Sequence, residues 1–176
     1  MAIVRNFLGS DMDIPEDRLY SPSAHFWFRR VSDAQFEVGV TEPGVALTGG
    51  LVELEVLAEP GAEIVPSEEV AFATTKKAIK FFMSPVGGRV TGANVAATAA
   101  DSGATAATVN EAPYDVWLFR MTLAAGADAT LVDGASYAAK LTASEHATDA
   151  AAAGAAAAKA GKISPTCKSI YSGIKQ

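Results

Sequence analysis

From residue 25 to residue 123 the apolar residues come in short runs, and glycine or proline interrupts the chain between most of them. These runs are rich in aromatic and β-branched residues, which favour strands over helices. The run at 51–57 also alternates, because Val52, Leu54 and Val56 fall on one face of an extended chain. Short strands separated by turns, with little helix between them, predict an all-β barrel or sandwich.

The remaining local patterns place the individual elements. Strands are expected at 25–31, 34–41, 51–57, 69–75 and 78–84, within 84–95, and at 116–123. Ser32-Asp33 is a turn signal, so the first two strands are expected to form a hairpin. Residues 42–50 end in two glycines and are expected to form a turn or a short helix. Residues 1–18 are expected to be an irregular lead-in.

The composition changes after about residue 123. Of the 19 residues from Ala143 to Gly161, 11 are alanine. Thr142 and Glu145 have the spacing of a capping box, which predicts a helix beginning there. Gly154 weakens that helix, and the segment has little apolar stripe with which to dock. Residues 124–176 are therefore expected to be an Ala-rich extension, helical or disordered.

The charge and the single cysteine limit the possible functions. The formal net charge of -6 and the pI near 4.9 argue against nucleic-acid binding, which needs a basic surface. One cysteine, Cys167, excludes an intramolecular disulfide. No apolar run approaches the roughly 20 residues of a membrane span, and the N-terminal residues do not resemble a signal peptide. We expect a cytoplasmic protein that binds neither nucleic acid nor membrane.

Other reactive residues offer little support for catalysis. His25 lies among aromatic residues and is expected to be a packed structural residue, and His146 is expected to be solvated. No second histidine or cysteine stands at metal-ligand spacing, so no metal site is expected. Cys167 is expected to be a reduced thiol. Glu53 and Glu55 share a strand face that is expected to be solvated, and no catalytic residues of an enzyme are predicted.

Two adjacent lysines, Lys76 and Lys77, stand between two predicted strands, and no acidic residue follows Glu69 until Asp101. A lysine at a hairpin tip holds a point charge on a flexible stem and is a nucleophilic amine once deprotonated. Such a turn can simply be solvated, or it can be an attachment point for a cofactor. The turn contains no Gly, Pro, Asn or Asp, which are the usual turn formers.

The segment "ATTKKAIKFFMSPVGGRV" resembles the lipoyl-attachment segment of glycine cleavage system H proteins and related lipoyl carriers. In that family the modified lysine sits at a hairpin tip, and the next strand runs into Ser-Pro-Val-x-Gly, here Ser84 to Gly88. The family spacing from that motif identifies Lys77 rather than Lys76, and Ala78 matches the small residue that follows. Three further stretches are similar to family motifs in order: "LYSPSAHFW" (19–27), "VGVTEPGVALTGGLVELEV" (38–56) and "VNEAPYDVWLF" (109–119).

The resemblance implies a lipoyl/H-protein-like domain over 14–123. Its implied fold is a flattened barrel or sandwich of the hammerhead, hybrid-motif type with short helices. It further implies a carrier rather than an enzyme, with lipoate amide-linked to Lys77. This swinging arm would shuttle a sulfur-bound intermediate, an aminomethyl group in glycine cleavage. The implied partners are the P, T and L proteins of glycine cleavage and a lipoate ligase or lipoyl transferase.

Departures from the family pattern leave two alternatives open. Thr74 replaces an acidic residue usual three positions before the modified lysine, and Lys76 replaces a valine-like residue. The stretch from Ile14 to Tyr20 resembles the start of lipoate-binding proteins of sulfur oxidation, whose partner is a heterodisulfide-reductase-like complex. The first alternative is such a sulfur carrier. The second is an H-like scaffold or binding module without a lipoyl group.

Overall fold

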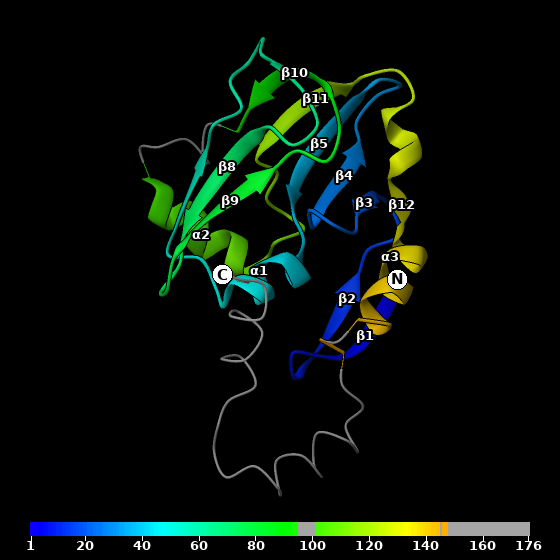
Figure 1. Ribbon diagram of the computed structural model, residues 1–176, viewed down its shortest axis with the longest axis vertical. Coiled ribbons are helices and arrows are strands. Elements are labelled where there is room, and N and C mark those ends of the chain that lie inside the picture. Colours follow the sequence, from blue (N-terminus) through cyan, green and yellow to red (C-terminus); the bar gives the residue numbers. More distant parts are fainter. Residues whose placement is uncertain (95–100, 145, 148–176) are drawn as a thin grey trace, which may run out of the picture.

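Two antiparallel sheets form the body of the protein in a computed structural model that describes residues 1–94, 101–144 and 146–147 (Figure 1). The larger sheet has the strand order β12 (Val132–Asp133), β3 (Leu19–Ser21), β4 (Phe26–Arg30), β5 (Gln35–Val40), β11 (Phe119–Leu123), β10 (Gly88–Ala93) and β7 (Glu63–Ile64). The smaller sheet consists of β6 (Glu53–Val56), β8 (Glu69–Thr74) and β9 (Ile79–Met83). The predicted mainly-β fold with short helices is confirmed.

The main core lies between these two sheets. Phe28, Val38 and Met121 point into it from the larger sheet, and Leu54 and Phe82 from the smaller one; all are buried. The alternation seen in the sequence thus identifies the inward residues, as expected for packed sheets. Helix α2 (Ser102–Glu111) packs against β6 and closes one end of this core with Ala106 and Val109.

Strand β4 is buried on both faces, which gives the protein a second core. Phe26 and Phe28 face the smaller sheet, whereas Trp27 faces the opposite side and joins Tyr20 and Tyr137. The indole N–H of Trp27 donates a 3.0 Å hydrogen bond to a backbone carbonyl. Gly39 is its register partner, and a Cβ there would lie 2.4 Å from the Trp27 ring. Only glycine therefore lets the indole lie flat on β5.

The N-terminal residues form a hairpin, so the expected irregular lead-in is wrong. Strands β1 (Ala2–Phe7) and β2 (Ser10–Ile14) pair through a turn in which Leu8 and Gly9 both have positive φ. A turn with two positive φ values matches the twist of paired strands. Val4, Phe7 and Ile14 are completely buried in the second core. Burial of this apolar face stabilises the hairpin.

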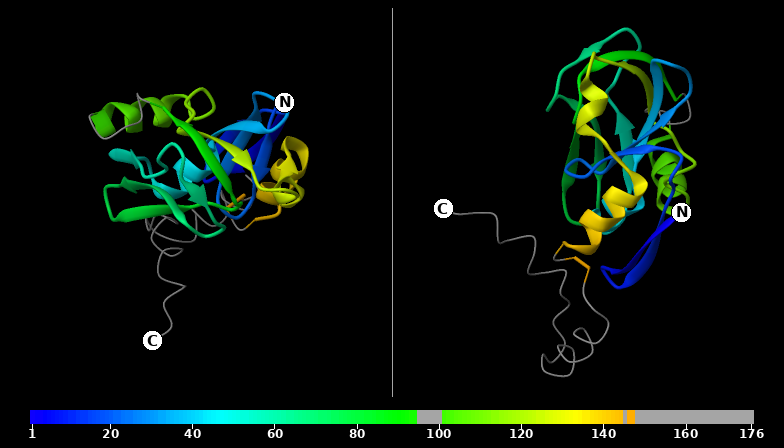
Figure 2. Two further views of the ribbon diagram at one scale, coloured as in Figure 1. Left: turned by 90° about the horizontal axis from the view of Figure 1, so that it is seen from above. Right: turned by 90° about the vertical axis from the view of Figure 1, so that its right-hand side faces the viewer.

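Much of the expected extension also packs against the body. A 3-10 helix, η3 (Ala127–Thr130), leads through β12 into α3 (Gly134–Thr142), and Figure 2 shows α3 lying against the larger sheet. Tyr137 and Leu141 of α3 are buried among the residues of the second core. The helix predicted to begin at Thr142 is wrong, because α3 ends there. The Ala-rich stretch from residue 148 onward lies outside the described residues, and a division of the chain at residue 123 stays a prediction.

Helix α1 (Glu42–Thr48) confirms the expected short helix. Its N-cap is Thr41, whose hydroxyl accepts a 3.1 Å hydrogen bond from the Gly44 N–H, and Gly49 closes its C-terminus in the left-handed conformation. Serine or threonine at the N-cap and glycine after the last turn are the usual signals for helix ends. Residues of α1 and of the edge strand β9 line the same pocket.

Candidate functional site

The turn between β8 and β9 carries Lys76 and Lys77 at its tip. The hydroxyl of Thr75 accepts hydrogen bonds from the backbone N–H groups of Lys77 (3.2 Å) and Ala78 (3.1 Å) and donates one to the Ala78 carbonyl (2.9 Å). The Thr75 N–H also donates to the same carbonyl. Neither lysine has a positive φ. The side chain of Thr75 therefore closes the turn, which explains how it forms without glycine, proline or asparagine.

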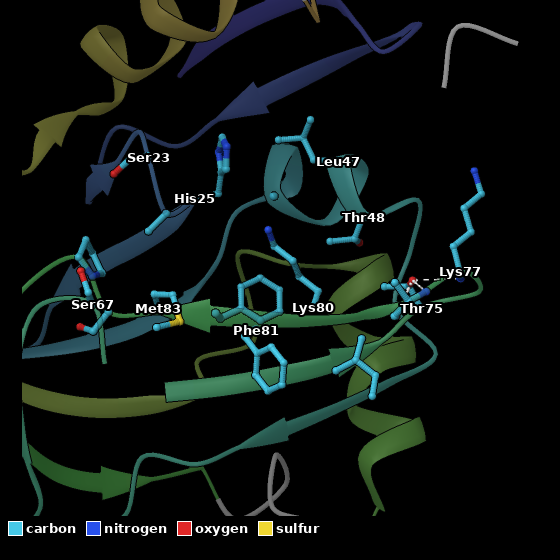
Figure 3. Close-up of a pocket in the computed structure, with 17 residues that line it drawn as sticks. Ser23, His25, Leu47, Thr48, Ser67, Thr75, Lys77, Lys80, Phe81 and Met83 are labelled. Carbon is cyan, nitrogen blue, oxygen red and sulfur yellow. Dashed lines mark hydrogen bonds between the residues drawn. The ribbon is translucent and has the colours of Figure 1, made fainter. Parts of the chain in front are cut away.

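Both lysine side chains are exposed, and Figure 3 shows Lys77 standing away from the hairpin tip. Among the described residues no carboxylate forms an ion pair with either of them. The turn thus presents Lys77 on a backbone fixed by Thr75, with its amine free to be reached by an enzyme. Lys76 shares the exposure but does not line the groove beside it.

A groove of about 620 Å³ runs along the free edge of β9, on the side away from β8 (Figure 3). One wall is β9 and its flanking residues from Lys77 to Pro85, and the other wall is α1 with the loop before β4. The residues of this second wall are Ser23, Ala24, His25, Gly44, Leu47 and Thr48. The groove begins at the lysine turn, so a group attached to Lys77 would have a partly apolar surface along which to lie.

His25 stands in the wall of the groove with an unusual backbone. Its φ is +55°, and its Nδ1 shares a 2.8 Å hydrogen bond with the Tyr137 hydroxyl. The same hydroxyl lies 3.0 Å from Thr41 Oγ1. Burial, and then the positive charge of Lys80, lowers the pKa of His25 to about 4. His25 is therefore a neutral, fixed imidazole at pH 7, as its expected structural role requires, and it also lines the groove.

Close packing holds this wall in place. A Cβ at Gly44 would lie 2.8 Å from His25 Cβ. Glycine at this position lets the first turn of α1 approach the loop that carries His25. The aromatic rings of Tyr137 and Tyr20 stack at 4.7 Å behind the histidine. The groove wall thus rests on the second core.

Two groups of the site were not anticipated from the sequence. Thr75 is one. A threonine at the end of a predicted strand can be either an ordinary strand residue or the residue whose side chain closes the turn, and the sequence does not distinguish the two. Lys80 is the other: it lines the groove and extends from β9 toward α1 (Figure 3). The alternation of β9 gave no signal for Lys80, because its neighbours Ile79 and Phe81 line the groove as well.

The other candidate residues lie apart from the groove or outside the described residues. Glu53 is exposed and Glu55 half-buried on β6, at the far edge of the smaller sheet. His146 makes an edge-on ring contact with Phe7 at 5.8 Å, so it packs on the hairpin. Cys167 lies outside the described residues.

Metal-binding clusters and membrane-spanning helices are both absent from the residues that the structure describes. These residues contain no group of three or more histidine, cysteine, aspartate or glutamate side chains arranged to hold a metal ion. Within the same residues, none of the helices has the length and apolar character that a membrane span requires.

Comparison with known proteins gives one consistent result. The model of the family described as glycine cleavage H-protein matches residues 18–144. The chain is 36% identical over 126 residues to a glycine cleavage system H protein of Burkholderia cenocepacia (strain HI2424), which covers 71% of this chain and 94% of that relative. A glycine cleavage system H protein of Azoarcus sp. (strain BH72) is 36% identical over 129 residues, with 73% of this chain and 96% of the relative covered.

A solved structure agrees with these sequence matches. The crystal structure of a glycine cleavage system H protein from Mycobacterium marinum superposes with a TM-score of 0.59 and 26% identity. It covers 72% of this chain and 98% of that one. The predicted resemblance is confirmed.

Proposed function

Because this chain belongs to the glycine cleavage H-protein family, we propose that it is a lipoyl carrier and that Lys77 is its attachment residue. The observation that carries the proposal is the geometry of the β8–β9 turn, where Thr75 fixes the backbone and Lys77 is exposed at the start of the groove. The family spacing to Ser84-Pro85 selects the same residue.

The residues around the turn fit a lipoyl group. An amide-linked group needs a lysine that a ligase can reach, and Lys77 stands clear of the sheet. The attached chain is apolar, and the groove offers Leu47, Phe82 and Met83 along its length. When bound, the lipoyl group supplies a disulfide that can be reduced and can carry a group on sulfur. The chain itself supplies position, because a tethered arm raises the local concentration at each docked enzyme.

The proposed roles of the residues follow from their positions. Lys77 forms the amide, and Thr75 holds the turn in the shape that a ligase meets. His25, kept neutral and oriented by Tyr137, presents a polar wall to whatever lies in the groove. Glycine cleavage enzymes, the P, T and L proteins, are the proposed partners. A lipoate ligase or lipoyl transferase is proposed to modify Lys77, and the carrier is proposed to act in the cytoplasm without catalysis of its own.

The direct test is intact-mass spectrometry with peptide mapping, both on protein isolated from its host and after incubation with lipoate ligase, ATP and lipoate. We expect a mass gain of one lipoyl group on the peptide that contains Lys77. Lys77→Arg should abolish the gain, whereas Lys76→Arg, the matched control at the same tip, should retain it.

Modification of Lys76 in place of Lys77 would refute the assigned site. Protein from the host that lacks any lipoyl group, while other lipoyl proteins of that host carry theirs, would refute the carrier function. That second result would favour the scaffold alternative.

A further inference from the structure

The outer surface of the smaller sheet carries a stripe of exposed apolar side chains. Phe82 of β9 is buried in the main core, and the residues that alternate with it, Ile79, Phe81 and Met83, are 60%, 48% and 37% exposed. The ring of Phe72, on the adjacent strand β8, lies 6.3 Å from that of Phe81, so the stripe extends onto β8. Exposed apolar side chains that adjoin one another in this way are typical of an interaction surface.

The same surface carries one glutamate for each exposed residue of β9. Register partners on neighbouring antiparallel strands point to the same face of a sheet. The rows across the sheet are Ile79–Thr74–Glu53, Phe81–Phe72–Glu55 and Met83–Glu69. Among the described residues, none of the three glutamates forms an ion pair. This surface, called the β9 face below, thus offers apolar contacts together with negative charges that no cation neutralises.

The formal charge of the chain is divided unevenly along its length. Residues 1–149 carry -10, whereas residues 150–176 carry +4 and contain no aspartate or glutamate. The positive charges belong to Lys159, Lys162, Lys168 and Lys175. The same stretch contains the large apolar residues Ile163, Ile170, Tyr171 and Ile174. The segment 159–176 therefore combines lysines with apolar side chains, which is the composition that complements the β9 face.

This C-terminal segment lies outside the described residues and beyond residue 144, where the family match ends. The described part of the chain ends near the β9 face. Ala147 bridges to the β1–β2 hairpin, and His146 lines a small pocket with His25 and Leu47, which both also line the groove beside β9. Eleven residues separate Ala147 from Lys159, and an extended chain of that length spans about 40 Å. The segment can therefore reach the β9 face of its own molecule.

We propose that residues 159–176 bind the β9 face of the same molecule, with their apolar side chains on the exposed stripe and their lysines beside the glutamates. Tethering favours this occupant over a second copy, because it holds the segment at a roughly millimolar effective concentration. The stripe begins two residues after Lys77, so a bound segment covers the surface next to the attachment turn. A ligase or partner enzyme that approaches Lys77 across this face has to displace it. The contact itself does not require lipoylation, so its failure and that of the carrier function are separate results.

The single cysteine of the chain allows a direct test, because Cys167 lies inside the proposed segment. A nitroxide attached to Cys167 of the full-length ¹⁵N-labelled protein broadens the amide signals of residues near it. We expect the paramagnetic relaxation of the Phe81 and Met83 amides to be several-fold faster than that of Ile3. Ile3 is a stringent reference, since it is 47% exposed and apolar and lies on the hairpin that Ala147 contacts. Relaxation at Ile3 equal to or faster than at Phe81 would overturn the proposal.

Variants of both surfaces, with the nitroxide kept in place, show whether the contact has the proposed chemistry. Replacement of the four lysines of the segment by glutamine, or of Glu53, Glu55 and Glu69 by glutamine, should lower the relaxation at Phe81 several-fold. Phe81→Ser should do the same at Met83. Added salt should weaken the contact, because the charges involved are exposed. Glu59→Gln combined with Glu63→Gln, which changes exposed acids outside the β9 face, is the control and should have little effect. Relaxation that survives loss of the lysines would show adhesion of the nitroxide and contradict the proposal.

A mixing experiment distinguishes the same molecule from a second copy. Nitroxide-labelled protein without ¹⁵N is mixed with ¹⁵N-labelled Cys167→Ser protein, so that only contacts between molecules broaden the signals. We expect the Phe81 and Met83 signals to remain sharp in this mixture. Broadening there as strong as in the singly labelled protein would assign the β9 face to the segment of another copy and refute the contact within one molecule.

Discussion

At the scale of single residues, the hydroxyl of Thr75 determines the shape of the lysine turn. It accepts two backbone N–H groups and donates to one carbonyl, and no other side chain of the turn does so. We expect Thr75→Ala to destabilise the protein by about 1 kcal/mol, the usual net value of such hydrogen bonds. We also expect it to slow lipoylation of Lys77 several-fold, because the ligase would meet a mobile turn.

Thr75→Ser is the matched control for this prediction. It keeps the hydroxyl and should retain both the stability and the rate of lipoylation, measured by urea unfolding and by intact mass over time. If Thr75→Ala is modified as fast as the original protein, the cap has no part in recognition.

A second prediction at this scale concerns the titration of His25. Its pKa is lowered to about 4 in the folded protein, mainly by burial, against roughly 6.5 in an unfolded chain. Between these values the unfolded chain binds the proton more readily, so stability should fall as the pH drops from about 6.5 to 4. The expected loss across that window is about 2–3 kcal/mol.

Urea unfolding at several pH values measures this loss. His25→Asn should make the free energy of unfolding nearly independent of pH above pH 5, because asparagine does not titrate. Asparagine also tolerates the positive φ at this position. An unchanged slope in this variant would show that another group is responsible. An NMR titration of the His25 ring provides an independent value of its pKa.

At the scale of elements, a charge cluster joins three neighbouring strands of the larger sheet. Glu37 of β5 lies opposite Arg29 of β4 and Arg120 of β11 in the strand register. Its Oε1 accepts a 2.8 Å hydrogen bond from Arg120, and its Oε2 accepts one of 3.0 Å from Arg29 Nε. The side chain of Glu37 is only 4% exposed, whereas those of the arginines are about 40% exposed.

The pKa of Glu37 follows from this arrangement. Burial by itself raises its pKa, but hydrogen bonds from Arg120 and Arg29 outweigh that effect and hold the pKa below its usual value. A depressed carboxylate pKa stabilises the fold above about pH 4.5 and loses that contribution as the pH falls through the folded value. We expect Glu37→Gln to cost about 2 kcal/mol at pH 7 and clearly less at pH 3.

Thermal or urea unfolding at these two pH values checks the prediction for Glu37. Glu63→Gln is a suitable control, because its 3.7 Å pair with Arg89 is exposed on both sides and such pairs contribute little. An equal cost of Glu37→Gln at both pH values would contradict the ionic origin of its contribution.

The elements also show what the sequence could and could not predict. The strands from β4 to β11 follow from alternation and from turn residues, and α1 follows from its glycine stop. The β1–β2 hairpin was missed because Leu8-Gly9 is a weak turn signal and because its buried face is completed by α3, more than 120 residues later. Such long-range burial cannot be predicted from a local pattern.

The position of Lys77 could be predicted from the sequence, and its role as the attachment residue stays a prediction. Lys77 follows from the spacing of a family motif, and the structure places it at a hairpin tip. The groove could not be predicted, because it forms where β9 meets α1 and the loop that carries His25. From the sequence alone, Lys80 looks like an ordinary charged surface residue. It lines the groove only because α1 packs across the free edge of β9.

At the scale of the whole molecule, β4 couples the two cores. Phe26 and Phe28 belong to the core between the sheets, and Trp27 belongs to the core beneath α3 and the hairpin. Because β4 contributes side chains to both cores, unfolding of one core would displace this strand and disrupt the other core. We therefore expect residues 1–144 to unfold in a single transition rather than as separate units divided at residue 123.

Phe7→Ala tests this coupling from the far end of the second core. Phe7 is completely buried, and removal of a buried phenylalanine ring costs about 3–5 kcal/mol. Ile3→Ala is the control on the same strand, because Ile3 is largely exposed.

If the cores unfold together, Phe7→Ala should lower the denaturation midpoint equally when it is followed by tryptophan fluorescence and by far-UV circular dichroism. Hydrogen exchange at β8 and β9, in the other core, should accelerate by the same free energy. A shift seen at α3 and the hairpin but not at β8 would mean that the site-bearing sheet folds independently, and it would place a boundary between the two cores.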